Sequence, residues 1–126
     1  MNSLPPATVS LLGLNIFVHV AIFLTSASGN SFSIAADPIL YHGEWYRIMS
    51  SAFVHGGFFH ILMNMMSMAQ LGPALECKFG TLPFAFMTLW TIITNGSCYV
   101  LIAWLGFEAS GDVAWLYHAG VGYSGV

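Results

Sequence analysis

Three long apolar stretches separated by polar segments dominate the sequence. They cover about residues 8–26, 58–75 and 82–107. At a rise of about 1.5 Å per helical residue, each is long enough to cross a hydrocarbon core about 30 Å thick. A fourth apolar stretch begins at about residue 120. The pattern predicts an all-α membrane protein with three transmembrane helices and the start of a fourth.

The segments between these stretches differ in length and chemistry. Residues 27–57 mix Ser, Gly and Asn with Tyr41, Trp45 and Tyr46, which predicts a long loop at the membrane interface, where aromatic rings are favoured. Residues 76–80 predict a short polar turn, and residues 108–119 a second loop. Lys78 in the short turn favours the cytosolic side for that turn and the opposite side for both longer loops.

Composition strengthens the membrane interpretation. Hydrophobic residues make up 57% of the chain and charged residues 6%, and the mean hydropathy is +0.77. The charged residues all fall between the apolar stretches, as expected for spans and loops. With two basic residues and a net charge of -3, the chain offers no surface for nucleic acid. Cys77 and Cys98 are interpreted as packing residues, and we expect no cofactor.

Polar residues recur at helical spacing on two of the spans. Asn15 and His19 are four residues apart on the first, and His60 and Asn64 are four apart on the second, where Ser67 continues the same face. An unpaired imidazole or carboxamide in hydrocarbon costs several kcal/mol, so these faces should contact protein or water. A purely structural role remains an open interpretation for both pairs.

The last residues hold a candidate nucleophile. Gly122-Tyr123-Ser124-Gly125 stands at the start of the fourth apolar stretch. The flanking glycines allow close approach of other backbone, and the N–H groups of a helix start can stabilise an oxyanion. Small residues that let membrane helices touch are the alternative interpretation of this motif.

Taken together, these features resemble the rhomboid family of intramembrane serine proteases. The first residues and residues 119–121 look closest to the rhomboid-domain-containing branch of the endoplasmic reticulum, so we expect an integral protein of that or another endomembrane. The resemblance rests on Trp45-Tyr46-Arg47, on His55 followed by His60-Ile61-Leu62-Met63-Asn64, on Glu76 with Gly80, and on Gly122-Tyr123-Ser124-Gly125.

The resemblance implies a rhomboid-like bundle with a six-helix core, of which this chain is the N-terminal part. Ser124 is then the nucleophile, supported by Gly122 and Gly125, with a histidine of the sixth span as general base. His60, Asn64 and the backbone N–H of Ser124 form the oxyanion hole. The implied substrates are transmembrane segments of membrane proteins within the lipid bilayer.

The resemblance also implies structural roles. Arg47 and His55 brace the first loop and the entrance of the second span, and Glu76 braces the turn at the opposite side. His55 and His60 are five residues apart and not spaced like helix-borne zinc ligands, so we expect no metal site.

The general base is missing from this chain. His118 precedes Ser124 by six residues but lies on the predicted loop, which makes it a poor candidate. Without a base the serine hydroxyl is a weak attacker at neutral pH, so we expect the 126 residues alone to be inactive.

Two other functions remain open. One is a catalytically inactive rhomboid- or derlin-like adaptor that binds membrane clients and passes them to degradation machinery. The intact Ser124 motif favours the protease over this adaptor. The other is a small scaffold or channel subunit, for which only hydrophobicity argues. The sequence names no substrate and no oligomeric state.

Overall fold

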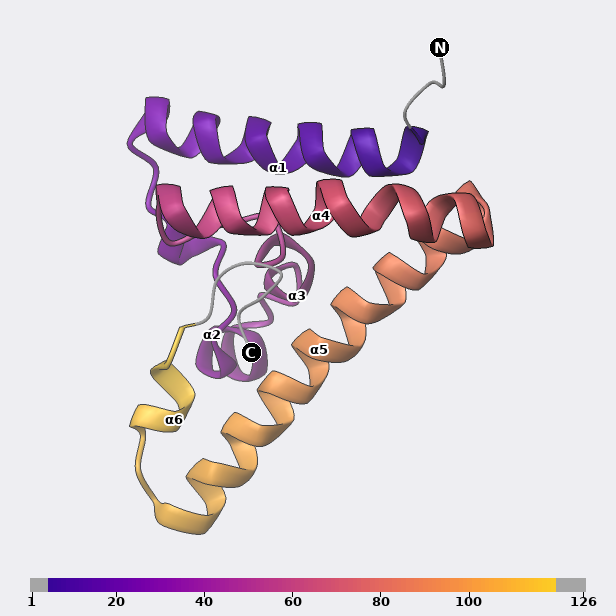
Figure 1. The fold of residues 1–126 in the computed structure, drawn as a ribbon. Coiled ribbons are helices and arrows are strands. Elements are labelled where there is room, and N and C mark those ends of the chain that lie inside the picture. Colours follow the sequence, from indigo (N-terminus) through magenta and orange to yellow (C-terminus); the bar gives the residue numbers. More distant parts are fainter. Residues whose placement is uncertain (1–4, 120–126) are drawn as a thin grey trace.

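The structure, a computed structural model, describes residues 5–119 of the chain. Three long helices carry the architecture, and short helices lie between and after them (Figure 1). The elements in chain order are α1 (Pro6–Thr25), η1 (Gly29–Ser31), α2 (Ala36–His42), α3 (Arg47–Ser50), α4 (Phe58–Phe79), α5 (Thr81–Ser110) and α6 (Ala114–Tyr117).

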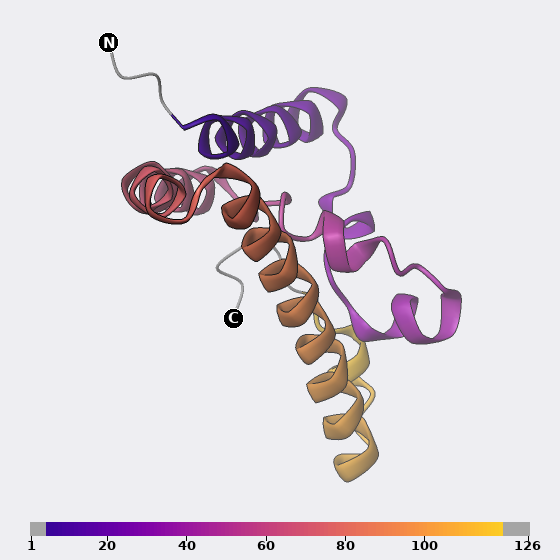
Figure 2. The same ribbon diagram turned by 90° about the vertical axis from the view of Figure 1, so that its right-hand side faces the viewer.

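Helices α1 and α4 lie side by side and run in opposite directions (Figure 1, Figure 2). Pro6 stands at the first helical position of α1, where its missing N–H removes no helical hydrogen bond. The two helices touch at Gly72, where an added Cβ would lie 2.7 Å from Thr8 Cγ2. The absent side chain of Gly72 is therefore what allows this close approach.

The connection between α4 and α5 is shorter than the sequence predicts. Residues 76–79, predicted as part of a polar turn, are the last turn of α4, and Gly80 alone separates the two helices. Gly80 has a φ of 92°, which side-chain-bearing residues rarely adopt. From this sharp corner α5 slopes away from α4 (Figure 1).

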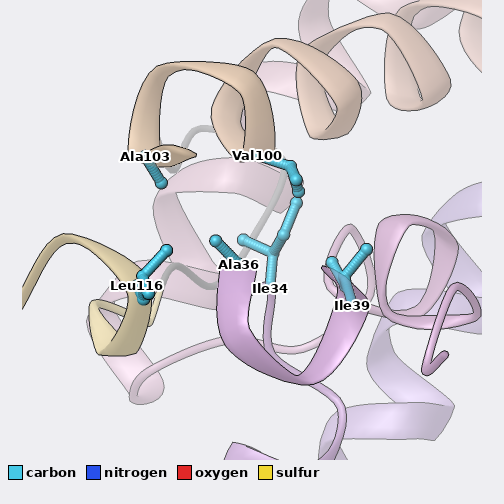
Figure 3. Packing of buried hydrophobic residues seen from close by; sticks show 6 residues of the cluster. All are labelled: Ile34, Ala36, Ile39, Val100, Ala103 and Leu116. Carbon is cyan, nitrogen blue, oxygen red and sulfur yellow. The ribbon is translucent and has the colours of Figure 1, made fainter. Parts of the chain in front are cut away.

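The short helices pack against the second half of α5. Helix α2 contacts both α5 and α6, while α3 contacts α5. Ile39 is fully buried there, so α2 is stabilised by packing. The main hydrophobic cluster joins these elements (Figure 3) and consists of Ile34, Ala36, Ile39, Val100, Ala103 and Leu116.

Two of the described helices, α1 and α5, are long and apolar enough to cross a membrane. Only 11% and 17% of their apolar windows are buried, unlike the core helix of a soluble protein. Helix α4 has 22 residues, which makes it about 33 Å long and thus long enough to cross a membrane. Its polar side chains lower its hydropathy, so it is not among the two candidate spans. The wide apolar surface of these helices fits contact with lipid or with further helices.

Candidate active site

The polar pair of the second span lies near the start of α4. Because α4 begins at Phe58, His60 lies in its first turn and Asn64 one turn further along. Both side chains are partly buried. The His60 ring meets the His55 ring edge-on, with centroids 5.3 Å apart. The structure therefore places His60 and Asn64 one turn apart on α4 and sets His55, at the end of the loop, against His60.

His55 stands between the first loop and α4. It is 7% exposed, and its Nδ1 lies 3.2 Å from the carbonyl oxygen of Phe53. The His19 ring of α1 approaches from the other side, with centroids 6.4 Å apart. Burial lowers the pKa of His55, and the Phe53 carbonyl opposes this only in part. Burial thus favours the neutral form of the His55 ring beside His60.

Asn64 holds an unused hydrogen-bond donor. Its Nδ2 is buried and has no hydrogen-bond partner among the described residues. Asn64 lines a pocket of about 330 Å³ between α1, α4 and α5. Ser67 lies on the same face, but its donor has a partner, because the hydroxyl donates to the Met63 carbonyl oxygen of its own helix at 3.0 Å. Asn64 can therefore donate to a group that forms beside α4, such as an oxyanion.

Arg47 ties the first loop together. Its Nη1 donates to the carbonyl oxygens of Asn30, at 2.6 Å, and Ser33, at 3.0 Å. Its Nε donates to Glu44 Oε2 at 2.5 Å, and this hydrogen bond lowers the pKa of Glu44. Glu44 is not among the residues predicted from the sequence, although an acidic residue three positions before the one arginine of the chain indicates such an ion pair.

Glu76 lies at the other end of α4. It is 2% exposed. Its carboxylate accepts hydrogen bonds from the backbone N–H groups of Ala7, at 2.9 Å, and Thr8, at 2.7 Å. It also accepts from the hydroxyls of Thr8, at 2.8 Å, and Thr81, at 2.9 Å. One side chain thus connects the starts of α1 and α5 to the end of α4, using amides that a helix start leaves unsatisfied.

The candidate nucleophile Ser124, with Gly122 and Gly125, lies outside the described residues. The chain leading to it is anchored, because the Tyr99 hydroxyl of α5 donates to the His118 carbonyl oxygen at 3.1 Å. His118 itself is exposed. The structure therefore places His55 against His60, with Asn64 one helical turn further along α4, and leaves the pairing with Ser124 as a prediction.

Comparisons with known proteins show to which family the chain belongs. The model of the rhomboid domain matches residues 42–126, more than half of the chain. Rhomboid-related protein 4 of Rattus norvegicus is 28% identical over all of this chain and 39% of its own length. Rhomboid-like protein 14, mitochondrial, of Arabidopsis thaliana is 32% identical over 97% of the chain and 38% of its own length.

A bacterial relative adds to the comparison. The putative rhomboid protease YdcA of Bacillus subtilis (strain 168) is 30% identical over 78% of this chain and 48% of its own length. The chain thus spans less than half the length of each of these relatives. No solved structure matches it. The matched domain and these relatives show that the chain belongs to the rhomboid family, a family of helical membrane proteins.

Proposed function

We propose that the complete protein is an intramembrane serine endopeptidase that cleaves transmembrane segments of other membrane proteins. The observation that carries the proposal is the buried Nδ2 of Asn64, which has no hydrogen-bond partner among the described residues. It lies one helical turn from His60 on α4 of a chain that belongs to the rhomboid family. Relatives named as a rhomboid protease and a putative rhomboid protease support the same chemistry.

In the proposed reaction, the Ser124 hydroxyl attacks the scissile carbonyl carbon while a general base takes its proton. The base then gives the proton to the departing amine as the peptide bond breaks, and water hydrolyses the resulting ester. We assign the base to a histidine outside this chain, because the relatives extend well beyond the matched length.

His60 and Asn64 act on the oxygen of the scissile group. In the tetrahedral intermediate this oxygen carries negative charge, and donors already oriented toward it stabilise the transition state. Loss of one such donor in other serine proteases costs about 10²–10³ in kcat. The T-shaped contact with His55 orients the His60 ring, and the hydrogen bonds of Arg47 hold the loop before it.

The setting of the reaction is also proposed. Substrate segments reach the site through the bilayer, in the endoplasmic reticulum or another endomembrane. An adaptor that hands clients to degradation machinery would use the same fold for binding, without needing Ser124. Cleavage and client binding must therefore be measured separately.

The test uses the complete protein in liposomes with a transmembrane reporter substrate. Ser124→Ala should abolish cleavage while co-purification of the reporter stays unchanged. Ser97→Ala is the matched control, because Ser97 is an exposed serine on α5, and it should cleave like the wild type. Cleavage that survives in Ser124→Ala contradicts the proposal. A wild type that binds the reporter without cutting it indicates the adaptor.

A further inference from the structure

Asn15 of α1 has a buried oxygen with no assigned role. The residue is 3% exposed. Its Nδ2 donates to the Leu11 carbonyl oxygen at 2.8 Å. This bond fixes the orientation of the carboxamide, because only the nitrogen can donate. Oδ1, the atom that remains, has no hydrogen-bond partner among the described residues.

A complementary atom lies in the same pocket. Asn15 and Asn64 both line the space of about 330 Å³ between α1, α4 and α5. Asn64 presents a donor without a partner, and Asn15 presents an acceptor without one. Most of the remaining wall is apolar and includes Leu11, Met68, Leu71, Leu75 and Phe84. None of the residues that line the pocket is charged.

The chemistry of this pocket selects water as its occupant. Buried polar groups without partners are rare in native proteins, and internal water is the usual partner where space allows. A water molecule can donate to Asn15 Oδ1 and accept from Asn64 Nδ2, which meets both needs. An apolar ligand would leave both atoms unpaired, and the pocket lacks the charge to hold an ion.

We propose that Asn15 is a positioning residue that holds the Asn64 carboxamide through ordered water in this pocket. The inference rests on the proposed function, in which Asn64 is an oxyanion donor. A carboxamide has two N–H groups, so one can bind the water while the other remains free for the oxyanion. The close contact of Gly72 with Thr8 fixes the spacing of α1 and α4 along the same interface.

The first experiment measures cleavage kinetics with the complete protein. Asn15→Leu keeps the size of the side chain but removes the acceptor, and we expect kcat to fall about tenfold with KM unchanged. Asn15→Asp should restore most of kcat, because a neutral carboxyl keeps an acceptor and donates to the Leu11 carbonyl. Asn95→Leu is the matched control, because Asn95 lines a different pocket.

The second experiment does not depend on catalysis. In protein labelled with ¹⁵N-asparagine and dissolved in detergent micelles, the Asn64 side-chain amide should show a nuclear Overhauser effect to bound water. We expect this signal in the wild type and in Asn95→Leu, and its loss in Asn15→Leu.

The two readouts separate the possible failures. A protein that cleaves, but whose kcat and Asn64 signal are unchanged in Asn15→Leu, overturns the positioning role and leaves the protease standing. A wild type that never cleaves overturns the proposed function, while the amide signal still decides whether water links the two residues. Equal losses of kcat in Asn15→Leu and Asn95→Leu indicate general destabilisation and also overturn the positioning role.

Discussion

The buried polar groups at the two ends of α4 differ in their hydrogen bonding. At one end the Glu76 carboxylate accepts four hydrogen bonds, from two backbone amides and two hydroxyls. At the other end the buried Nδ2 of Asn64 has no hydrogen-bond partner within residues 5–119. The hydrogen bonds of Glu76 hold three helices together, which is a structural role. The end with Asn64 keeps a donor available for another molecule.

The two ends should also differ in how much their hydrogen bonds contribute to the free energy of unfolding. Hydrogen bonds to a charged group contribute about 1.5–3 kcal/mol each, so the Glu76 cluster should dominate the stability of this region. A buried donor without a partner costs about 1–3 kcal/mol. The water proposed above offsets much of this cost, so the Asn64 carboxamide should add little to the free energy of unfolding. Four predictions test this difference.

The largest effect on stability is expected from Glu76→Ala. It leaves the Ala7 and Thr8 amides and two hydroxyls without their acceptor, so the free energy of unfolding should fall by about 3–5 kcal/mol. Glu76→Gln keeps one acceptor oxygen and should lose about half as much. Unfolding in mixed detergent micelles measures both variants. Glu108→Gln, at an exposed position on α5, is the control and should match the wild type.

A smaller effect is expected at the contact between α1 and α4. Gly72→Ala places a methyl group 2.7 Å from Thr8 Cγ2, and the overpacking should cost about 1–3 kcal/mol in the same assay. Gly13→Ala is the matched control, since its Cβ would meet nothing within 4 Å. It should be neutral or stabilising by up to about 1 kcal/mol. Equal effects at the two glycines would contradict the close contact.

The smallest effect is a pH dependence at the His55 end. Burial holds the pKa of His55 below its ordinary value of 6.5. As pH falls through that value, the unfolded chain binds a proton that the folded chain does not, so stability is lost toward acid. His55→Gln should flatten the curve of melting temperature against pH below about pH 6.5. Superimposable curves for wild type and variant would show that His55 is not buried as a neutral ring.

The long helices could be predicted from the sequence, but their ends could only be approximated. Hydrophobic length indicated residues 8–26, 58–75 and 82–107, and the structure has helices Pro6–Thr25, Phe58–Phe79 and Thr81–Ser110. The difference after residue 75 has a physical reason. Charged Glu76 looked like part of a turn, yet donors from α1 and α5 satisfy it within the helix.

The short helices and the site show what depends on tertiary structure. Helices α2 and α6 are short, and their buried Ile39 and Leu116 depend on packing against α5, which local sequence does not reveal. His60 and Asn64 could be paired from their spacing alone. The contact between Thr8 and Glu76, 68 residues apart, could not. Ser124 lies outside the described residues and stays a prediction.

The measurement that tests the account most directly is kcat and unfolding free energy on the same preparation of Asn64→Ala. We predict that kcat falls about 10²–10³-fold, while the free energy of unfolding stays within about 1 kcal/mol of the wild type. This result would show that the Asn64 side chain acts in catalysis and contributes little to stability. Wild-type kcat, or a loss of stability as large as that of Glu76→Ala, would contradict the account.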